Sequence, residues 1–151
     1  MIGQYVSSMQ VTNSVPIIRE LRATDVVALA ELAELLGGSE VQHDWKLLFR
    51  RSPVVVIGAE EDGRMVGYAA GTVRSAFGLR TAGWVEAFGV DNAWRGRGLG
   101  RTLANALFER LRGLGAARVY GVVPLHDLVL APFFHDLGFR EEPLVCIGRT
   151  T

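Results

Sequence analysis

Glycines and arginines alternate along a short segment that follows an apolar run ending at Val90. The glycines stand at positions 96, 98 and 100, and the arginines at positions 95, 97 and 101. Glycine lets backbone N–H groups turn toward an anion, and the first turn of a helix adds amides that lack partners. Guanidinium groups supply cationic donors suited to a pyrophosphate. The segment therefore predicts a phosphate-binding loop at the start of a helix.

Two general nucleotide-binding motifs fit this segment poorly. A P-loop needs a lysine where Arg101 stands and a first glycine where Arg95 stands. A dinucleotide fingerprint needs a third glycine at another position and an acid about 20 residues further on, but the first acid beyond the next strand is Asp127. A nucleotide-binding protein stays an alternative that rests on the glycines alone.

A more specific pattern emerges when a second segment is added. Arg95, Gly98 and Gly100 have the spacing Arg/Gln-x-x-Gly-x-Gly/Ala, which resembles the acyl-CoA-binding motif of the GNAT family of N-acetyltransferases. Residues 127–139 are similar to the family's later signature, Asn-x-x-Ala-x-x-Phe-Tyr-x-x-x-Gly-Phe. The resemblance covers about residues 16–149. It implies acetyl-CoA as the co-substrate and an amine of a small molecule or peptide as the acceptor.

The resemblance also implies which residues hold acetyl-CoA. The pantetheine arm is expected on the backbone of Phe88, Gly89 and Val90, beside Asp127 and Phe134. Asp127 replaces the family's Asn, and capping of the following helix is its favoured role. The pyrophosphate is expected on a loop made of Arg95, Gly96, Arg97, Gly98, Leu99, Gly100 and Arg101.

A carboxylate within the apolar strand suggests the chemistry. An amine must lose a proton before it attacks a thioester, so the site needs a base, and Glu86 precedes the pantetheine-binding residues. The alternative for Glu86 is a carboxylate that faces outward or pairs with an arginine.

The leaving thiolate lacks its usual proton donor. Phe134 stands where the family has Tyr, and phenylalanine cannot donate a proton. His126 is our first choice as a substitute acid, ahead of Tyr120, His135 and Cys146. Transfer without an acid is a further possibility, and so is a catalytically weak or inactive acyl-CoA-binding module.

Composition narrows the class of protein. The chain has 151 residues, 16 basic and 16 acidic, with one cysteine and three histidines that show no metal-site spacing. We expect no metal, no nucleic-acid partner, no membrane partner and a cytoplasmic location. Segments that set acceptor specificity in the resembled family contain Glu34, Glu40, Asp44, Glu141 and Glu142. These acids would suit a cationic amine, but a solvated charged face is the favoured interpretation.

The elements around these residues predict an α+β fold of GNAT type, a mixed sheet in a three-layer α-β-α arrangement. Residues 1–15 read as a flexible tail and 16–151 as one domain. A last strand able to pair with another edge makes a homodimer reasonable. Strands are expected at 17–21, 54–59, 65–73, 83–90, 118–123 and 144–149, and helices from Thr24 or Asp25 to Leu36, from Ser39 to Arg51, and at 97–112 and 128–137.

Overall fold

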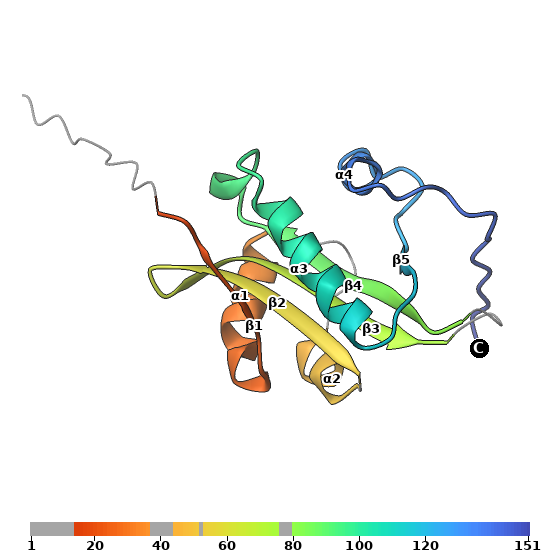
Figure 1. Ribbon diagram of the computed structural model, residues 1–151, viewed down its shortest axis with the longest axis horizontal. Coiled ribbons are helices and arrows are strands. Elements are labelled where there is room, and N and C mark those ends of the chain that lie inside the picture. Colours follow the sequence, from red (N-terminus) through yellow and green to blue (C-terminus); the bar gives the residue numbers. More distant parts are fainter. Residues whose placement is uncertain (1–13, 37–43, 52, 76–79) are drawn as a thin grey trace, which may run out of the picture. The chain divides into compact units, whose positions relative to one another are not determined.

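A computed structural model describes residues 14–36, 44–51, 53–75 and 80–151 of the chain (Figure 1). The chain divides into two compact units, Met1–Tyr120 and Gly121–Thr151. The expected single domain over 16–151 stays a prediction. Most of the expected tail, residues 1–13, lies outside the described residues. Among the described residues, no helix has the length and apolar character needed to cross a membrane.

The first unit contains a mixed sheet in the order β1-β2-β3-β4-β5. Neighbours from β1 to β4 pair antiparallel. The amide of Gly83 donates to the carbonyl of Arg118 at 2.8 Å, and that of Ala117 donates to the carbonyl of Thr81 at 3.4 Å, so β4 and β5 advance in the same direction. The strands are β1 (Ile17–Glu20), β2 (Val54–Glu61), β3 (Arg64–Arg74), β4 (Ala82–Val90) and β5 (Val119–Gly121).

Helices cover both faces of this sheet, as predicted (Figure 1). On one face lie α1 (Val26–Leu35) and α2 (Trp45–Arg50), whose buried Leu29 and Trp45 pack in one cluster with Tyr68 of β3. The opposite face carries α3 (Leu99–Gly113), which buries Leu103, Leu107 and Leu111 against the sheet. Leucines at helical spacing explain this second core.

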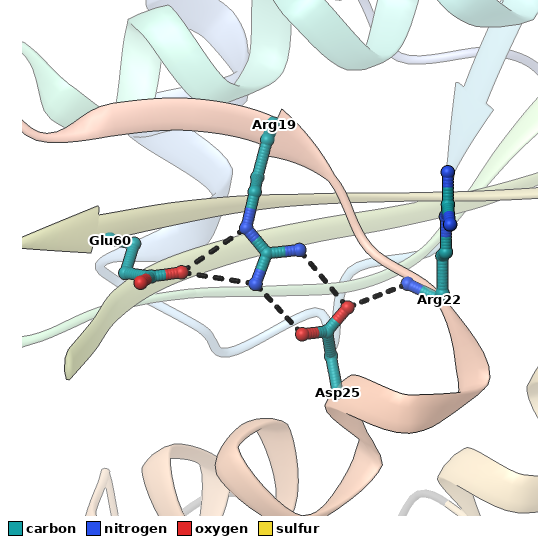
Figure 2. Close-up of polar contacts among 4 residues, drawn as sticks. All are labelled: Arg19, Arg22, Asp25 and Glu60. Carbon is teal, nitrogen blue, oxygen red and sulfur yellow. Dashed lines mark hydrogen bonds and ion pairs between the residues drawn. The ribbon is translucent and has the colours of Figure 1, made fainter. Parts of the chain in front are cut away.

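An arginine on β1 ties the edge of the sheet to the start of the first helix (Figure 2). The Arg19 guanidinium donates to Asp25 at 2.7 and 3.1 Å and to Glu60 of β2 at 3.0 and 3.1 Å. Asp25 also accepts the amide of Arg22 at 2.8 Å, which caps the short 3-10 helix η1 (Ala23–Asp25). The hydrogen bonds from Arg19 and Arg22 lower the pKa of Asp25, and those to Asp25 and Glu60 raise the pKa of Arg19.

The second unit is built around α4 (Leu130–Asp136). Phe134 is buried and packs edge-to-face against Phe133 and Phe139, with ring centroids 5.7 and 4.9 Å apart. Gly138, at φ 94°, ends the helix in the left-handed conformation that glycine tolerates.

The expected strand at 144–149 was wrong. The structure assigns no strand to these residues, and Leu144, Val145 and Ile147 are exposed. The continuous apolar run 144–147 makes a segment able to form a strand, but a strand exists only when a neighbouring backbone completes its hydrogen bonds.

Helix boundaries differ from the expected ones by a few residues. Gly98 is the N-cap of α3, and Asp44 caps α2 by accepting the amide of Leu47 at 3.0 Å. The expected helix start at Ser39 lies outside the described residues.

Candidate functional site

A β-bulge in β4 places the candidate base. Ala70 of β3 pairs with Ala87, whereas the next residue, Gly71, pairs with Val85, so Glu86 is the extra residue between them. A bulge bends its strand and changes the direction of a side chain, and bulges are frequent beside active sites. The sequence predicted the strand over 83–90 but carried no signal for the bulge.

The Glu86 carboxylate is held through one of its oxygens. The Thr72 hydroxyl, on β3, donates to Glu86 Oε1 at 2.6 Å, and Arg74 Nη2 lies 3.9 Å from the same oxygen. Thr72 is buried, while the Glu86 side chain is 21% exposed. The expected alternative, pairing with an arginine, is therefore present in part. A carboxylate anchored at Oε1 can still accept a proton at Oε2.

Aromatic rings extend this cluster across the sheet. Tyr120 of β5 stacks on Trp84 of β4 with centroids 5.0 Å apart. Arg74 lies over the Trp84 ring at 4.8 Å, and Arg118 lies over the Tyr120 ring at 5.6 Å. This cluster of Glu86, its two partners on β3 and the stacked rings thus draws on three neighbouring strands.

The glycine segment has the backbone that its composition predicted. Gly96 and Gly98 have φ values of 72° and 80°, in the left-handed region. A Cβ added at either glycine would meet nothing within 4 Å, so the backbone faces open space. Buried Leu99 anchors the first turn of α3, whose leading amides have no partners within the helix. This geometry fits an anion bound by backbone N–H groups.

The arginines of this loop are partly engaged within the protein. Arg95 Nε donates to the carbonyl of Val90 at 3.3 Å, and Arg97 lies over the buried Trp94 ring at 5.0 Å. Trp94 therefore packs against the loop, as expected. Arg101 is exposed on the first turn of α3.

Asp91 positions the loop, a role that the sequence analysis missed. This buried carboxylate accepts the amide of Ala93 at 2.9 Å, which caps the 3-10 helix η2 (Asn92–Trp94). It also forms an ion pair with Arg64 Nη2 at 2.6 Å, while its own amide donates to the carbonyl of Val66. The available signal was an Asp directly after a strand, a frequent capping position.

The pantetheine-binding prediction falls on the far end of β4. The Gly83–Arg118 hydrogen bond joins β5 to the first residues of β4, whereas Phe88, Gly89 and Val90 are its last. A Cβ at Gly89 would come within 2.8 Å of Tyr68 and Leu36, so the chain passes closely there. Phe88 to Val90 as pantetheine contacts stay a prediction.

The remaining predicted site residues lie in the second unit. Asp127 accepts the amides of Val129 and Leu130 at 2.9 and 2.7 Å, which caps α4 and lowers the pKa of this carboxyl. The favoured capping role is thus present. His126 is exposed on the preceding turn, and Phe134 lies in the unit's core. Their roles toward acetyl-CoA stay predictions.

The described residues show no single cluster of the acids that were expected to attract a cationic acceptor. Glu34 is exposed on α1, Asp44 caps α2, and Glu40 lies outside the described residues. Glu141 and Glu142 belong to the second unit. Across the described ranges, no group of three or more His, Cys, Asp or Glu side chains could hold a metal ion.

Known proteins share both the sequence pattern and the fold. The pattern of the "Acetyltransferase (GNAT) family" matches residues 20–139. A glucosamine 6-phosphate N-acetyltransferase of Trypanosoma brucei brucei is 36% identical over 136 residues, covering 82% of this chain and 90% of the relative.

Two solved structures illustrate the fold similarity. A Trypanosoma brucei acetyltransferase matches with a TM-score of 0.67 and 27% identity, over 90% of this chain and 100% of that one. The aminoglycoside enzyme AAC(6')-Iy, in complex with the bisubstrate analogue CoA-S-monomethyl-acetylneamine, matches with a TM-score of 0.77 and 19% identity, over 91% of this chain and 99% of that one.

Proposed function

The chain belongs to the GNAT family of acetyltransferases, and we propose that it uses Glu86 as the general base of acetyl transfer. The predicted family, fold and activity are confirmed: it is an acetyl-CoA-dependent N-acetyltransferase. The observation that supports Glu86 is its place in the bulge of β4, where Thr72 holds one carboxylate oxygen at 2.6 Å.

We propose that acetyl-CoA binds through its pyrophosphate on the loop from Arg95 to Arg101. The left-handed Gly96 and Gly98 and the open space above them support this assignment. The pantetheine arm is assigned to the backbone of Phe88, Gly89 and Val90, which lead into the loop.

In this mechanism the acceptor amine gives a proton to Glu86 and attacks the thioester carbonyl. The new C–N bond forms, the C–S bond breaks, and the electron pair leaves with the sulfur of CoA. The second proton, which the nitrogen loses as it becomes an amide, passes to that thiolate or to water. A thiolate with a pKa near ~8.5 is a tolerable leaving group at neutral pH, so transfer does not require an acid. His126 remains our candidate for a residue that protonates it.

A substrate panel follows from the relatives. It contains glucosamine 6-phosphate and an aminoglycoside, the compounds named for two of them, and a peptide amine. Release of thiol from acetyl-CoA measures transfer to each.

Replacing Glu86 tests the base. Glu86→Gln keeps the shape of the side chain but cannot accept the proton, so kcat should fall about 100-fold or more, with little change in KM for acetyl-CoA. Glu109→Gln is the matched control, since Glu109 is exposed on α3 and forms an ion pair with neighbouring Arg112 at 3.0 Å. Full activity of Glu86→Gln at every pH would refute the assignment.

Activity and binding measurements would also detect two alternative functions. Binding of acetyl-CoA without thiol release for any amine would indicate a catalytically inactive binding module. ATP or NAD that displaces acetyl-CoA in a thermal-shift assay would indicate a nucleotide-binding protein.

A further inference from the structure

An ion pair joins the β2–β3 hairpin to the segment that leads into the glycine loop. Arg64 opens β3, directly after the turn at Asp62 and Gly63, and its Nη2 lies 2.6 Å from Asp91 Oδ2. The Asp91 side chain is 10% exposed, whereas that of Arg64 is 65% exposed, so the pair joins a buried carboxylate to a surface guanidinium. Arg64 takes no part in the mechanism proposed for acetyl transfer.

Direct contacts continue from Asp91 into the loop. Asp91 lies four positions before Arg95, the first residue of the proposed coenzyme loop. Its Oδ1 accepts the amide of Ala93 at 2.9 Å, and its carbonyl accepts the amide of Trp94 at 2.8 Å, so both groups hold the turn η2. The buried Trp94 ring in turn contacts the Arg97 guanidinium at 5.0 Å. An unbroken series of contacts thus runs from the hairpin to the loop.

The charge of Asp91 opposes coenzyme binding unless it is balanced. The pyrophosphate of acetyl-CoA is an anion, and a buried carboxylate that water screens poorly repels it. Arg64 donates a hydrogen bond to this carboxylate at 2.6 Å, which offsets its field at the loop and keeps the buried charge paired. The Arg64–Asp91 pair therefore caps η2 with little net charge.

We propose that Arg64 is a positioning residue for acetyl-CoA, which neutralises Asp91 and holds it as the cap of the segment before the loop. The inference rests on the proposed binding of the pyrophosphate at residues 95–101. It adds the β2–β3 hairpin to the parts of the chain that set coenzyme affinity. Arg64 differs from the loop arginines because it acts through Asp91 rather than by contact with phosphate.

Isothermal titration with CoA tests the inference without an acceptor. Arg64→Gln should raise the dissociation constant for CoA about 10-fold, because the Asp91 charge is then unbalanced beside the pyrophosphate. Adding Asp91→Asn should return the constant to within about 3-fold of wild type, since asparagine keeps a capping oxygen and carries no charge. Arg110→Gln, which removes an exposed arginine of α3 paired with Glu20 at 2.7 Å, is the matched control and should bind CoA like wild type.

The stoichiometry of the titration counts folded protein, so a less stable variant is not mistaken for one with lower affinity. Unchanged affinity of Arg64→Gln for CoA, or a loss that Asp91→Asn does not reverse, would overturn the role of the ion pair and leave the acetyltransferase proposal standing. The proposed base has its own test in Glu86→Gln and the proposed loop in Gly98→Ala, so failure of either is distinguishable from failure of this inference.

Discussion

Thr72 is the residue that orders the proposed base. Its hydroxyl is buried and donates to Glu86 Oε1 at 2.6 Å, from the strand that faces the bulge. A carboxylate fixed at one oxygen presents the other in a defined direction, and catalysis depends on such alignment. We therefore regard Thr72 as a positioning residue.

Thr72→Val removes the hydroxyl and keeps the branched shape. We expect kcat to fall about 10- to 100-fold while KM for acetyl-CoA changes little, because the base loses its orientation and the glycine loop is untouched. Thr72→Ser keeps the hydroxyl and should restore most of kcat. Steady-state kinetics of both variants checks this, and equal losses in the two would mean that Thr72 matters only for packing.

The glycine loop at the start of α3 is the element on which we place the cofactor site. Gly98, at φ 80°, is its N-cap, and the left-handed region costs other residues roughly 1–2 kcal/mol. The sequence could predict this loop because anion binding there would use the backbone N–H groups of consecutive residues, and glycine itself allows the backbone conformation that this requires.

Gly98→Ala should weaken CoA binding about 10-fold. Alanine lets the empty loop relax to negative φ, so that binding must restore the strained conformation. Gly113→Ala, at the other end of the same helix, is the matched control: no atom lies within 4 Å of its added Cβ, and CoA affinity should be unchanged. Isothermal titration measures both, and equal affinities for CoA in the two variants would contradict a role for the Gly98 conformation.

Elements were predicted well where the signal is local. Leucines at helical spacing predicted α3, and Asp62-Gly63 predicted the β2–β3 hairpin, whose turn has positive φ at both residues. The bulge at Glu86 and the unpaired segment 144–149 were missed, because both depend on what the neighbouring strand does rather than on the segment's own residues.

At the scale of the whole first unit, the Arg19 network joins β1, η1 and β2. Asp25 accepts two hydrogen bonds from Arg19 and one from the Arg22 amide, and these lower its pKa. A carboxyl with a lower pKa in the folded state stabilises the fold above its unfolded pKa, near ~3.9, and that contribution is lost as pH falls through the folded value.

Asp25→Asn should therefore reduce the free energy of unfolding by about 1 kcal/mol at neutral pH. The difference from wild type should shrink as the pH falls below about 4, where wild-type Asp25 also loses its charge. Urea unfolding at several pH values measures this. Glu109→Gln, in an exposed pair on one helix, should change stability little, and a constant difference across pH for Asp25→Asn would rule out the charge as the cause.

The sequence by itself determined the family and most elements and predicted a cofactor loop, because these follow from residue types at short spacing. Arg95, Gly98 and Gly100 lie within six positions, and backbone conformation there depends on glycine itself. Only the tertiary structure decided what surrounds Glu86. Thr72 and Arg74 lie 14 and 12 positions away in the chain and meet Glu86 from the adjacent strand β3, where register and a bulge, not local composition, set which side chains touch.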